Sequence, residues 1–214
     1  MALASELTSF YDNLHRNIPP DVSATFKAAI RDHEIGFRRE AAVKVGDRLP
    51  DFSLPDANGH PWSKDTLLGK GPLLISFYRG GWCPMCNIEL RALQKHSHTI
   101  RAKGVTLVAI SPDAPDQSLS RKEKMGLDYM VLSDTGNVLA SRLGIVNKQP
   151  ESMRPIIGSL DNGFHDPNKS MDVPVPATIL VDDEGVVRQT YINPKYHERL
   201  EPETAIRWIE KLKS

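Results

Sequence analysis

The most informative stretch of the chain is ISFYRGGWCPMCNIELRAL, which covers residues Ile75–Leu93. An apolar run of strand length, Leu73–Tyr78, ends in a glycine-rich turn, and a helical pattern of apolar residues begins directly after that turn. Cys83 and Cys86 stand at the start of the predicted helix, and Pro84 occupies a first-turn position that favours proline. The two cysteines therefore lie one helical turn apart, beside backbone N–H groups that have no partner within the helix.

This placement favours the thiolate form of Cys83, because the helix dipole and the unpaired N–H groups stabilise an anion. We therefore expect Cys83 to have a lowered pKa in partly exposed surroundings. Lowering a thiol pKa from about 8.5 to about 6.5 requires roughly 2.7 kcal/mol, whereas a helix terminus typically contributes ~0.3–1 kcal/mol. Candidates for the additional stabilisation are the Cys86 thiol, the turn N–H groups and Arg79, the nearest cation in the sequence. Trp82 and Pro84 are interpreted as residues that shape the site.

The spacing of the cysteines suits a reversible cycle between dithiol and disulfide, since Cys86 can resolve a mixed disulfide on Cys83. Half of a zinc site is a second interpretation, but the nearby His96 and His98 do not have the usual zinc-finger spacing. Two inert core thiols are a third. We expect the redox-active pair, acting without a metal and without any other cofactor.

Strand and helix patterns alternate along the rest of the chain, which is typical of a mostly parallel sheet covered by helices. Strands are predicted at 51–54, 73–78, 105–110 and 130–132, and a hairpin at 176–192. Helices are predicted at 84–103, 114–125 and 138–143, with a last helix that begins near Pro202.

The chain divides into an N-terminal helical extension, residues 1–44, and a main domain, residues 45–214. The extension has apolar residues at helical spacing on both sides of Pro19–Pro20, so we predict two helices that serve as a packing or dimerisation arm without chemistry. The proline- and glycine-rich residues 147–175 are predicted to be an insertion with at most a short helix around 153–160. We expect this insertion to lie beside the cysteine pair and to limit access to it.

Composition excludes several classes of partner. The chain has 27 basic and 27 acidic side chains and a formal net charge of zero, which does not fit binding to nucleic acid or to an anionic membrane. Its first residues lack the basic start and the apolar run of a secretion signal, and it has no apolar stretch of membrane-spanning length. We therefore expect a cytoplasmic protein.

Over residues 45–212 the chain resembles the thioredoxin-like superfamily, and within it the peroxiredoxin-like branch of the alkyl hydroperoxide reductase/thiol-specific antioxidant family. Residues 45–54 resemble the recurring first strand of that family, and residues 174–185 resemble its proline-containing strand beside the active site. The resemblance implies an α/β thioredoxin fold: three layers, α/β/α, with a mixed central sheet, here with the N-terminal helical extension added.

The motif combines features of two chemistries. In peroxiredoxins that resemble the bacterioferritin-comigratory type, a Pro-x₃-Thr-x₂-Cys motif would place the peroxidatic cysteine on Cys86, the threonine on Cys83 and the proline on Arg79. The arginine with which such enzymes bind peroxide would fall near Pro176. The residues found at these positions resemble those of thioredoxins and glutaredoxins instead. In that pattern Cys83 would attack the substrate, Cys86 would resolve the resulting mixed disulfide, and a cis peptide bond would precede Pro176.

Thioredoxins also place a buried acidic residue on the strand before the motif, and Phe77 stands at that position here. Glu89, one turn beyond Cys86, is a candidate substitute base, and its alternative interpretation is an ordinary solvated helix charge.

The resemblance implies a thiol-dependent antioxidant oxidoreductase that uses its CxxC pair to reduce hydroperoxides or protein disulfides. Its partners would be the hydroperoxide or disulfide substrate and a thiol reductant of the thioredoxin, glutaredoxin or glutathione type, and a homodimer is an option. A non-catalytic redox sensor or adaptor of the same fold stays open at this point. Turnover with a thiol reductant separates the sensor from the enzyme.

Overall fold

The central sheet is built around β3 (Leu73–Phe77), whose side chains are all buried, as expected for a strand covered on both faces. The structure is a computed structural model and describes residues 2–160 and 170–212. β4 (Thr106–Ser111) and β5 (Met130–Ser133) continue the sheet in parallel on one side of β3. β8 (Ala177–Val181) and β9 (Val187–Ile192) follow antiparallel on the other side, in the order β5-β4-β3-β8-β9. The sheet is therefore mixed, as the thioredoxin fold requires, and the βα alternation alone overstated its parallel character.

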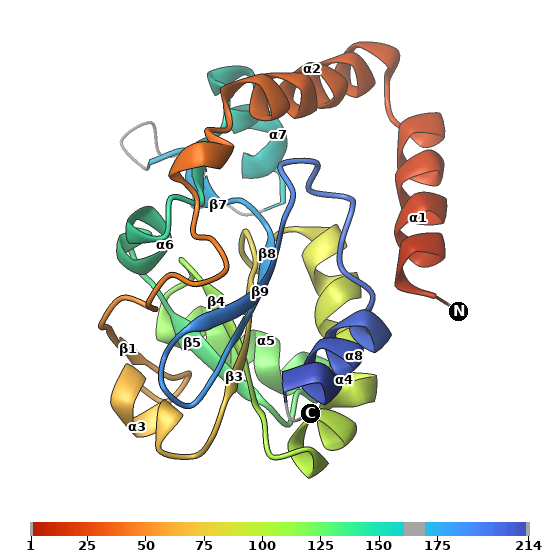
Figure 1. The fold of residues 1–214 in the computed structure, drawn as a ribbon. Helices are drawn as coiled ribbons and strands as arrows, with labels where there is room; N and C mark the ends of the chain where they lie inside the picture. Colours follow the sequence, from red (N-terminus) through yellow and green to blue (C-terminus); the bar gives the residue numbers. More distant parts are fainter. Residues whose placement is uncertain (1, 161–169, 213–214) are drawn as a thin grey trace.

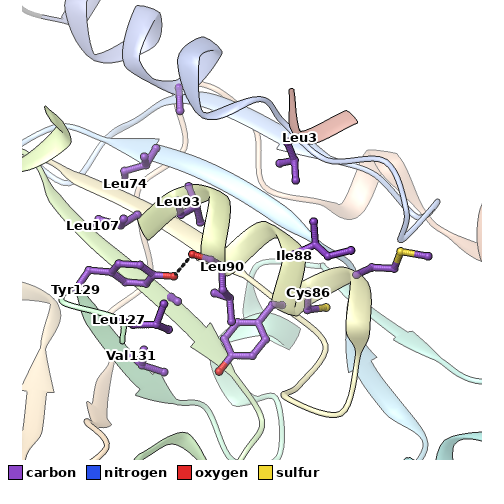
Figure 2. Close-up of a cluster of buried hydrophobic side chains, with 14 of the residues drawn as sticks. Leu3, Leu74, Cys86, Ile88, Leu90, Leu93, Leu107, Leu127, Tyr129 and Val131 are labelled. Carbon is purple, nitrogen blue, oxygen red and sulfur yellow. Dashed lines mark hydrogen bonds between the residues drawn. The ribbon is translucent and has the colours of Figure 1, made fainter. Parts of the chain in front are cut away.

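Alternate side chains of β3 enter different clusters, because successive residues of a strand point to opposite faces. Leu74 lies in the cluster covered by α4 (Pro84–Ala102) and α8 (Pro202–Leu212), whereas Leu73 and Ile75 belong to the cluster on the other face. Figure 2 shows part of the first cluster, with Cys86 beside Ile88 on α4.

The α4 face is completed by α5 (Pro115–Met125) and by the residues that follow it. The Tyr129 hydroxyl donates a hydrogen bond of 3.0 Å to the Leu90 carbonyl of α4 (Figure 2). This bond satisfies a buried hydroxyl and ties α4 to the segment that enters β5.

The opposite face of the sheet is covered by α6 (Val138–Arg142) and by α3 (Lys64–Leu68) with its preceding hairpin. This hairpin pairs β1 (Ser53–Pro55) with β2 (Pro61–Ser63). β1 falls at the predicted strand 51–54. β2 and α3 were not expected, because Pro61–Ser63 shows no apolar alternation and a five-residue helix is too short to show a hydrophobic period.

The two predicted N-terminal helices are present as α1 (Leu3–Asn17) and α2 (Pro20–Gly36), and a one-turn helix, η1 (Arg39–Ala41), follows them. Figure 1 shows α1 beside the main body and α2 crossing above α7. Leu3 and Leu7 of α1 are buried in the α4 cluster. The backbone N–H groups of Leu3 and Ala4 donate to the Glu201 carboxylate at 3.0 and 2.7 Å, so the start of α1 is fixed to the segment before α8.

The proline-rich segment at 147–175 has short elements of its own. β6 (Val146–Lys148) pairs antiparallel with β7 (Asp172–Pro174), and between them lie η2 (Glu151–Met153) and α7 (Arg154–Gly158). The predicted short helix is thus confirmed, while residues 161–169 of the predicted insertion lie outside the described residues. The division into an extension, a main domain and an insertion stays a prediction.

None of the helices in the described part of the chain combines the length and the apolar character needed to cross a lipid bilayer.

Candidate functional site

The turn between β3 and α4 brings the cysteines to the edge of the sheet. Gly80 has a φ of +136° and is required there, since a Cβ atom would lie 2.6 Å from Nε1 of the Trp82 indole. The N–H of Gly81 donates to the Asp113 carboxylate at 2.8 Å, which fixes the turn against the end of β4. Cys83 is the N-cap residue of α4, so its sulfur lies at the positive end of the helix dipole.

Both cysteines are free thiols in the structure and both are buried, Cys83 with 2% of its surface exposed and Cys86 with none. The expectation that Cys83 lies in partly exposed surroundings is therefore wrong, although Cys83 is the less buried of the two. The reason is tertiary, since side chains of α1, α2 and α7 approach the start of α4.

Cys83 has the features of a stabilised thiolate. Burial raises the pKa of Cys83, but the hydrogen bond from the Cys86 thiol and the charges of Arg79 and Arg199 outweigh it and bring the pKa to about 5. The sequence predicted this direction and named both the Cys86 thiol and Arg79 as contributors. It gave no sign of Arg199.

Arg79 is itself buried, with 3% of its surface exposed. Its Nη1 lies 4.0 Å from the Cys83 sulfur, and its guanidinium lies between two aromatic rings, 4.8 Å from the Trp82 centroid and 4.3 Å from the Tyr196 centroid. Among the described residues, Nε and Nη2 of Arg79 have no hydrogen-bond partner. The charge of Arg79 is thus held close to the Cys83 sulfur, and two of its N–H groups remain able to donate a hydrogen bond to a ligand.

A second buried arginine serves Cys86. Arg199 Nη2 donates to the Cys86 sulfur at 3.4 Å, while Nη1 forms an ion pair with the Glu89 carboxylate. Nε and Nη2 also donate to the Tyr196 carbonyl, at 2.8 and 2.6 Å. Burial raises the pKa of Cys86 well above its usual value, and the hydrogen bond and charge of Cys83 raise it further, so Cys86 remains a thiol.

Glu89 is buried with 3% of its surface exposed, so its interpretation as a solvated helix charge is wrong. Burial raises the pKa of Glu89, and despite the opposing charge of Arg199 the pKa reaches about 7. A signal for this burial was in the sequence, because Glu89 follows Cys86 by three residues and precedes Leu93 by four, on the apolar face of α4. Arg199 had no comparable signal, since it is 113 residues from Cys86 in a polar segment.

Cys83 borders a cavity of about 220 Å³. Its walls come from the two N-terminal helices, from the start of α4 and from α7: Phe10, Leu14, Ile18, Val22, Phe26, Arg79, Trp82, Cys83, Pro84, Met85, Met153, Ile156, Ile157, Ser159, Leu160 and Tyr196. The N-terminal helices, to which the sequence pattern gave no chemical role, are thus part of the surroundings of Cys83.

The predicted site residues are brought together only in part. Arg79, Trp82 and Pro84 line the cavity with Cys83, whereas Glu89 lies on the Cys86 side. Pro176 is buried directly before β8 but is absent from the lining of this cavity. The expected cis bond before Pro176 is wrong, since no described peptide bond is cis. The trans bond lies in the short link from β7 to β8, where the Val175 N–H donates to the Ile145 carbonyl.

The zinc interpretation finds no geometric support in the residues that the structure describes. Those residues contain no group of three or more His, Cys, Asp or Glu side chains placed to hold a metal ion. His96 instead lies 3.4 Å from the Glu203 carboxylate.

The chain is similar to known thiol-active proteins over most of its length. Residues 45–190 match the AhpC/TSA family. The chain is 27% identical to peroxiredoxin Bcp of Escherichia coli over 149 residues, 70% of this chain and 85% of that protein. It is also 25% identical to the thiol-disulfide oxidoreductase ResA of Geobacillus kaustophilus over 166 residues, 77% of this chain and 79% of that protein.

The fold agrees with these matches. A solved structure of peroxidoxin BcpB from Mycobacterium tuberculosis superposes with a TM-score of 0.64 at 22% identity and covers 80% of this chain and 99% of its own. The match over residues 45–190 and this common fold show that the chain belongs to the AhpC/TSA family and is a peroxiredoxin-like oxidoreductase with the thioredoxin fold.

Proposed function

We propose that Cys83 and Cys86 form a redox pair with which this protein reduces hydroperoxides or protein disulfides. The observation that carries the proposal is the Cys83 sulfur, which lies at the start of α4 and whose pKa is lowered to about 5 by the Cys86 thiol and two buried arginines. At neutral pH such a sulfur is a thiolate, which is the nucleophilic form of cysteine.

The cycle has three balanced steps. With a hydroperoxide ROOH, the Cys83 thiolate attacks the terminal oxygen, the O–O bond breaks, and the products are a sulfenic acid and, after proton uptake, the alcohol ROH. The Cys86 thiol then attacks the sulfenic acid, forming a disulfide and releasing water. Two thiols of a reductant restore the dithiol and leave as their own disulfide, which supplies the two electrons that the peroxide consumed. With a disulfide substrate, a mixed disulfide on Cys83 replaces the sulfenic acid.

We assign the attack to Cys83 and the resolving step to Cys86. The family pattern would put the peroxidatic sulfur on Cys86, but the pKa of Cys86 is raised well above its usual value while that of Cys83 is lowered. A buried thiol at neutral pH is a poor first nucleophile and a suitable resolving group. The charge and hydrogen bond of Arg199 favour the Cys86 thiolate, but burial and the neighbouring Cys83 outweigh them, so the resolving role of Cys86 holds.

The physiological partners follow from the same chemistry. The reductant must deliver two thiols to a buried disulfide, so we propose a thioredoxin-, glutaredoxin- or glutathione-like thiol. Homodimer formation stays a prediction, which the mass of the native protein in solution tests.

The proposal is tested by intact mass and thiol titration after one equivalent of hydrogen peroxide, on the wild type and on the Cys83→Ser and Cys86→Ser variants. We expect the wild type to lose both thiols and two hydrogen atoms, and Cys86→Ser to gain one oxygen atom on Cys83. Multiple turnovers with a dithiol reductant distinguish the enzyme from a redox sensor. Rapid sulfenic acid formation in Cys83→Ser, together with an unreactive Cys86→Ser, would reverse the assignment of the two sulfurs.

A further inference from the structure

The cavity beside Cys83 has walls that the family match does not account for. Residues 45–190 match the AhpC/TSA family, yet α1, α2 and the link between them contribute five apolar residues from outside this range: Phe10, Leu14, Ile18, Val22 and Phe26. From inside it, α7 and the residues next to it add further apolar side chains, Met153, Ile156 and Ile157 among them. Residues outside the family match therefore help to shape the surroundings of the attacking sulfur.

The size and the lining of this cavity suit an apolar group. An apolar cavity of roughly 150 Å³ is large enough to hold benzene, and this cavity measures about 220 Å³. A phenyl group or a branched alkyl group would therefore fit against its walls. Hydrogen peroxide has no apolar group to bury against these walls, so they contribute no binding free energy for it.

Arg79 gives the cavity one polar end. It is the one cationic side chain among the described lining residues, and its Nη1 lies 4.0 Å from the Cys83 sulfur. Its Nε and Nη2 groups are buried and lack a hydrogen-bond partner among the described residues. An oxygen that develops negative charge next to Cys83 would supply the missing acceptor.

Resting on the proposed function, we infer that α1, α2 and α7 form a specificity pocket for the bulky apolar group of an organic hydroperoxide, with Arg79 binding the oxygen that leaves. The Cys83 thiolate attacks the terminal oxygen of ROOH, a sulfur–oxygen bond forms, and the O–O bond breaks. The electron pair of that bond stays on the RO⁻ oxygen, which Arg79 stabilises until a proton, equivalent to the one lost by Cys83, gives ROH. Sulfur is oxidised and the peroxide is reduced by two electrons.

An organic hydroperoxide is a better match than a protein disulfide for a sulfur as buried as that of Cys83. Cys83 is only 2% exposed beneath the pocket walls, so a folded partner cannot reach the sulfur without displacing them. An alkoxide is also a more basic leaving group than a thiolate, and hence benefits more from the unpaired Arg79 donors.

The test compares the rate constants for oxidation of the reduced protein by cumene hydroperoxide and by hydrogen peroxide. The variant is Val22→Phe, which fills the pocket from the half-buried side of α2. The matched control is Ile35→Phe on the same helix, where the side chain is 85% exposed. Ile156→Phe on α7 fills the pocket from another wall, should Val22→Phe fail to fold.

We expect the wild type to react at least ~10-fold faster with cumene hydroperoxide, since even one methylene in an apolar pocket changes specificity by about 10-fold or more. Val22→Phe should remove this preference by slowing the organic peroxide alone, and Ile35→Phe should leave both rates unchanged. The assignment of the cavity as a specificity pocket would be overturned if the wild type oxidised equally fast with both peroxides, or if Val22→Phe slowed both reactions equally.

A binding measurement separates this inference from the proposed function. The alcohol 2-phenyl-2-propanol, the product of cumene hydroperoxide, should bind the reduced protein and change the fluorescence of Trp82, which lines the cavity. Val22→Phe should weaken this binding, and Trp82→Phe should remove the signal. If the alcohol binds but neither peroxide oxidises Cys83, the pocket stands and peroxide reduction fails. If both peroxides react and the alcohol does not bind, the function stands and the pocket fails.

Discussion

Replacing Arg199 by methionine should strongly destabilise the reduced protein, because it leaves the Glu89 carboxylate buried without its partner. The side chains of Arg199 and Glu89 are 1% and 3% exposed, so solvent does not screen this ion pair. Removing one partner of a buried pair costs ~3–5 kcal/mol. For a chain of this length we expect Arg199→Met to lower Tm by about 6–20 °C.

The double variant Arg199→Met/Glu89→Met should recover much of this loss, since it leaves no unpaired charge. It cannot recover all of it, because the Tyr196 carbonyl still loses its two hydrogen bonds from Arg199, at roughly 1–3 kcal/mol for a buried acceptor.

The assay is urea unfolding of the reduced proteins at pH 8, followed by circular dichroism and compared through the free energy of unfolding. The matched control is Arg101→Met, which breaks the exposed pair between Arg101 and Asp128 and should cost under ~1 kcal/mol. The reasoning is refuted if Arg199→Met costs no more than Arg101→Met, or if the double variant is as unstable as Arg199→Met alone.

Three further predictions concern the titrating groups and the reaction order. The rate of alkylation of Cys83 by iodoacetamide should rise with pH around a midpoint near 5, and Arg79→Met should move the midpoint upward, because it removes a charge that favours the thiolate; an unmoved midpoint would exclude Arg79 as a cause. The pKa of Glu89 is raised to about 7, so the folded state binds more protons than the unfolded state, and Glu89 should lower stability as pH rises from about 4.5 to about 7. Glu89→Gln should flatten that part of the curve of unfolding free energy against pH, and an identical slope would contradict the raised pKa. With an aromatic disulfide, Cys86→Ser should accumulate a mixed disulfide on Cys83 while Cys83→Ser reacts slowly, and peptide mapping that finds the adduct on Cys86 would contradict this order.

The parts of this protein that depend on local pattern can be predicted from consecutive residues. The apolar run that becomes β3, the glycine turn and the helical period that becomes α4 are each written in consecutive residues, and together they placed Cys83 and Cys86 at a helix start. This strand–turn–helix, with the strand patterns that follow it, was enough for the fold and for the family resemblance. Such features can be predicted because backbone geometry fixes their periods.

The groups that surround the two sulfurs come from elements that are distant in the sequence and meet only when the chain folds. Arg199 reaches Cys86 across 113 residues, and the N-terminal helices meet Cys83 from the other end of the chain. Neither contact leaves a period or a spacing in the sequence, because both depend on how separate elements pack. Burial follows from the same packing, and so the exposure of Cys83 and the solvation of Glu89 were predicted wrongly. Charge and burial at a site are sums over neighbours in space, whereas a sequence pattern records neighbours along the chain.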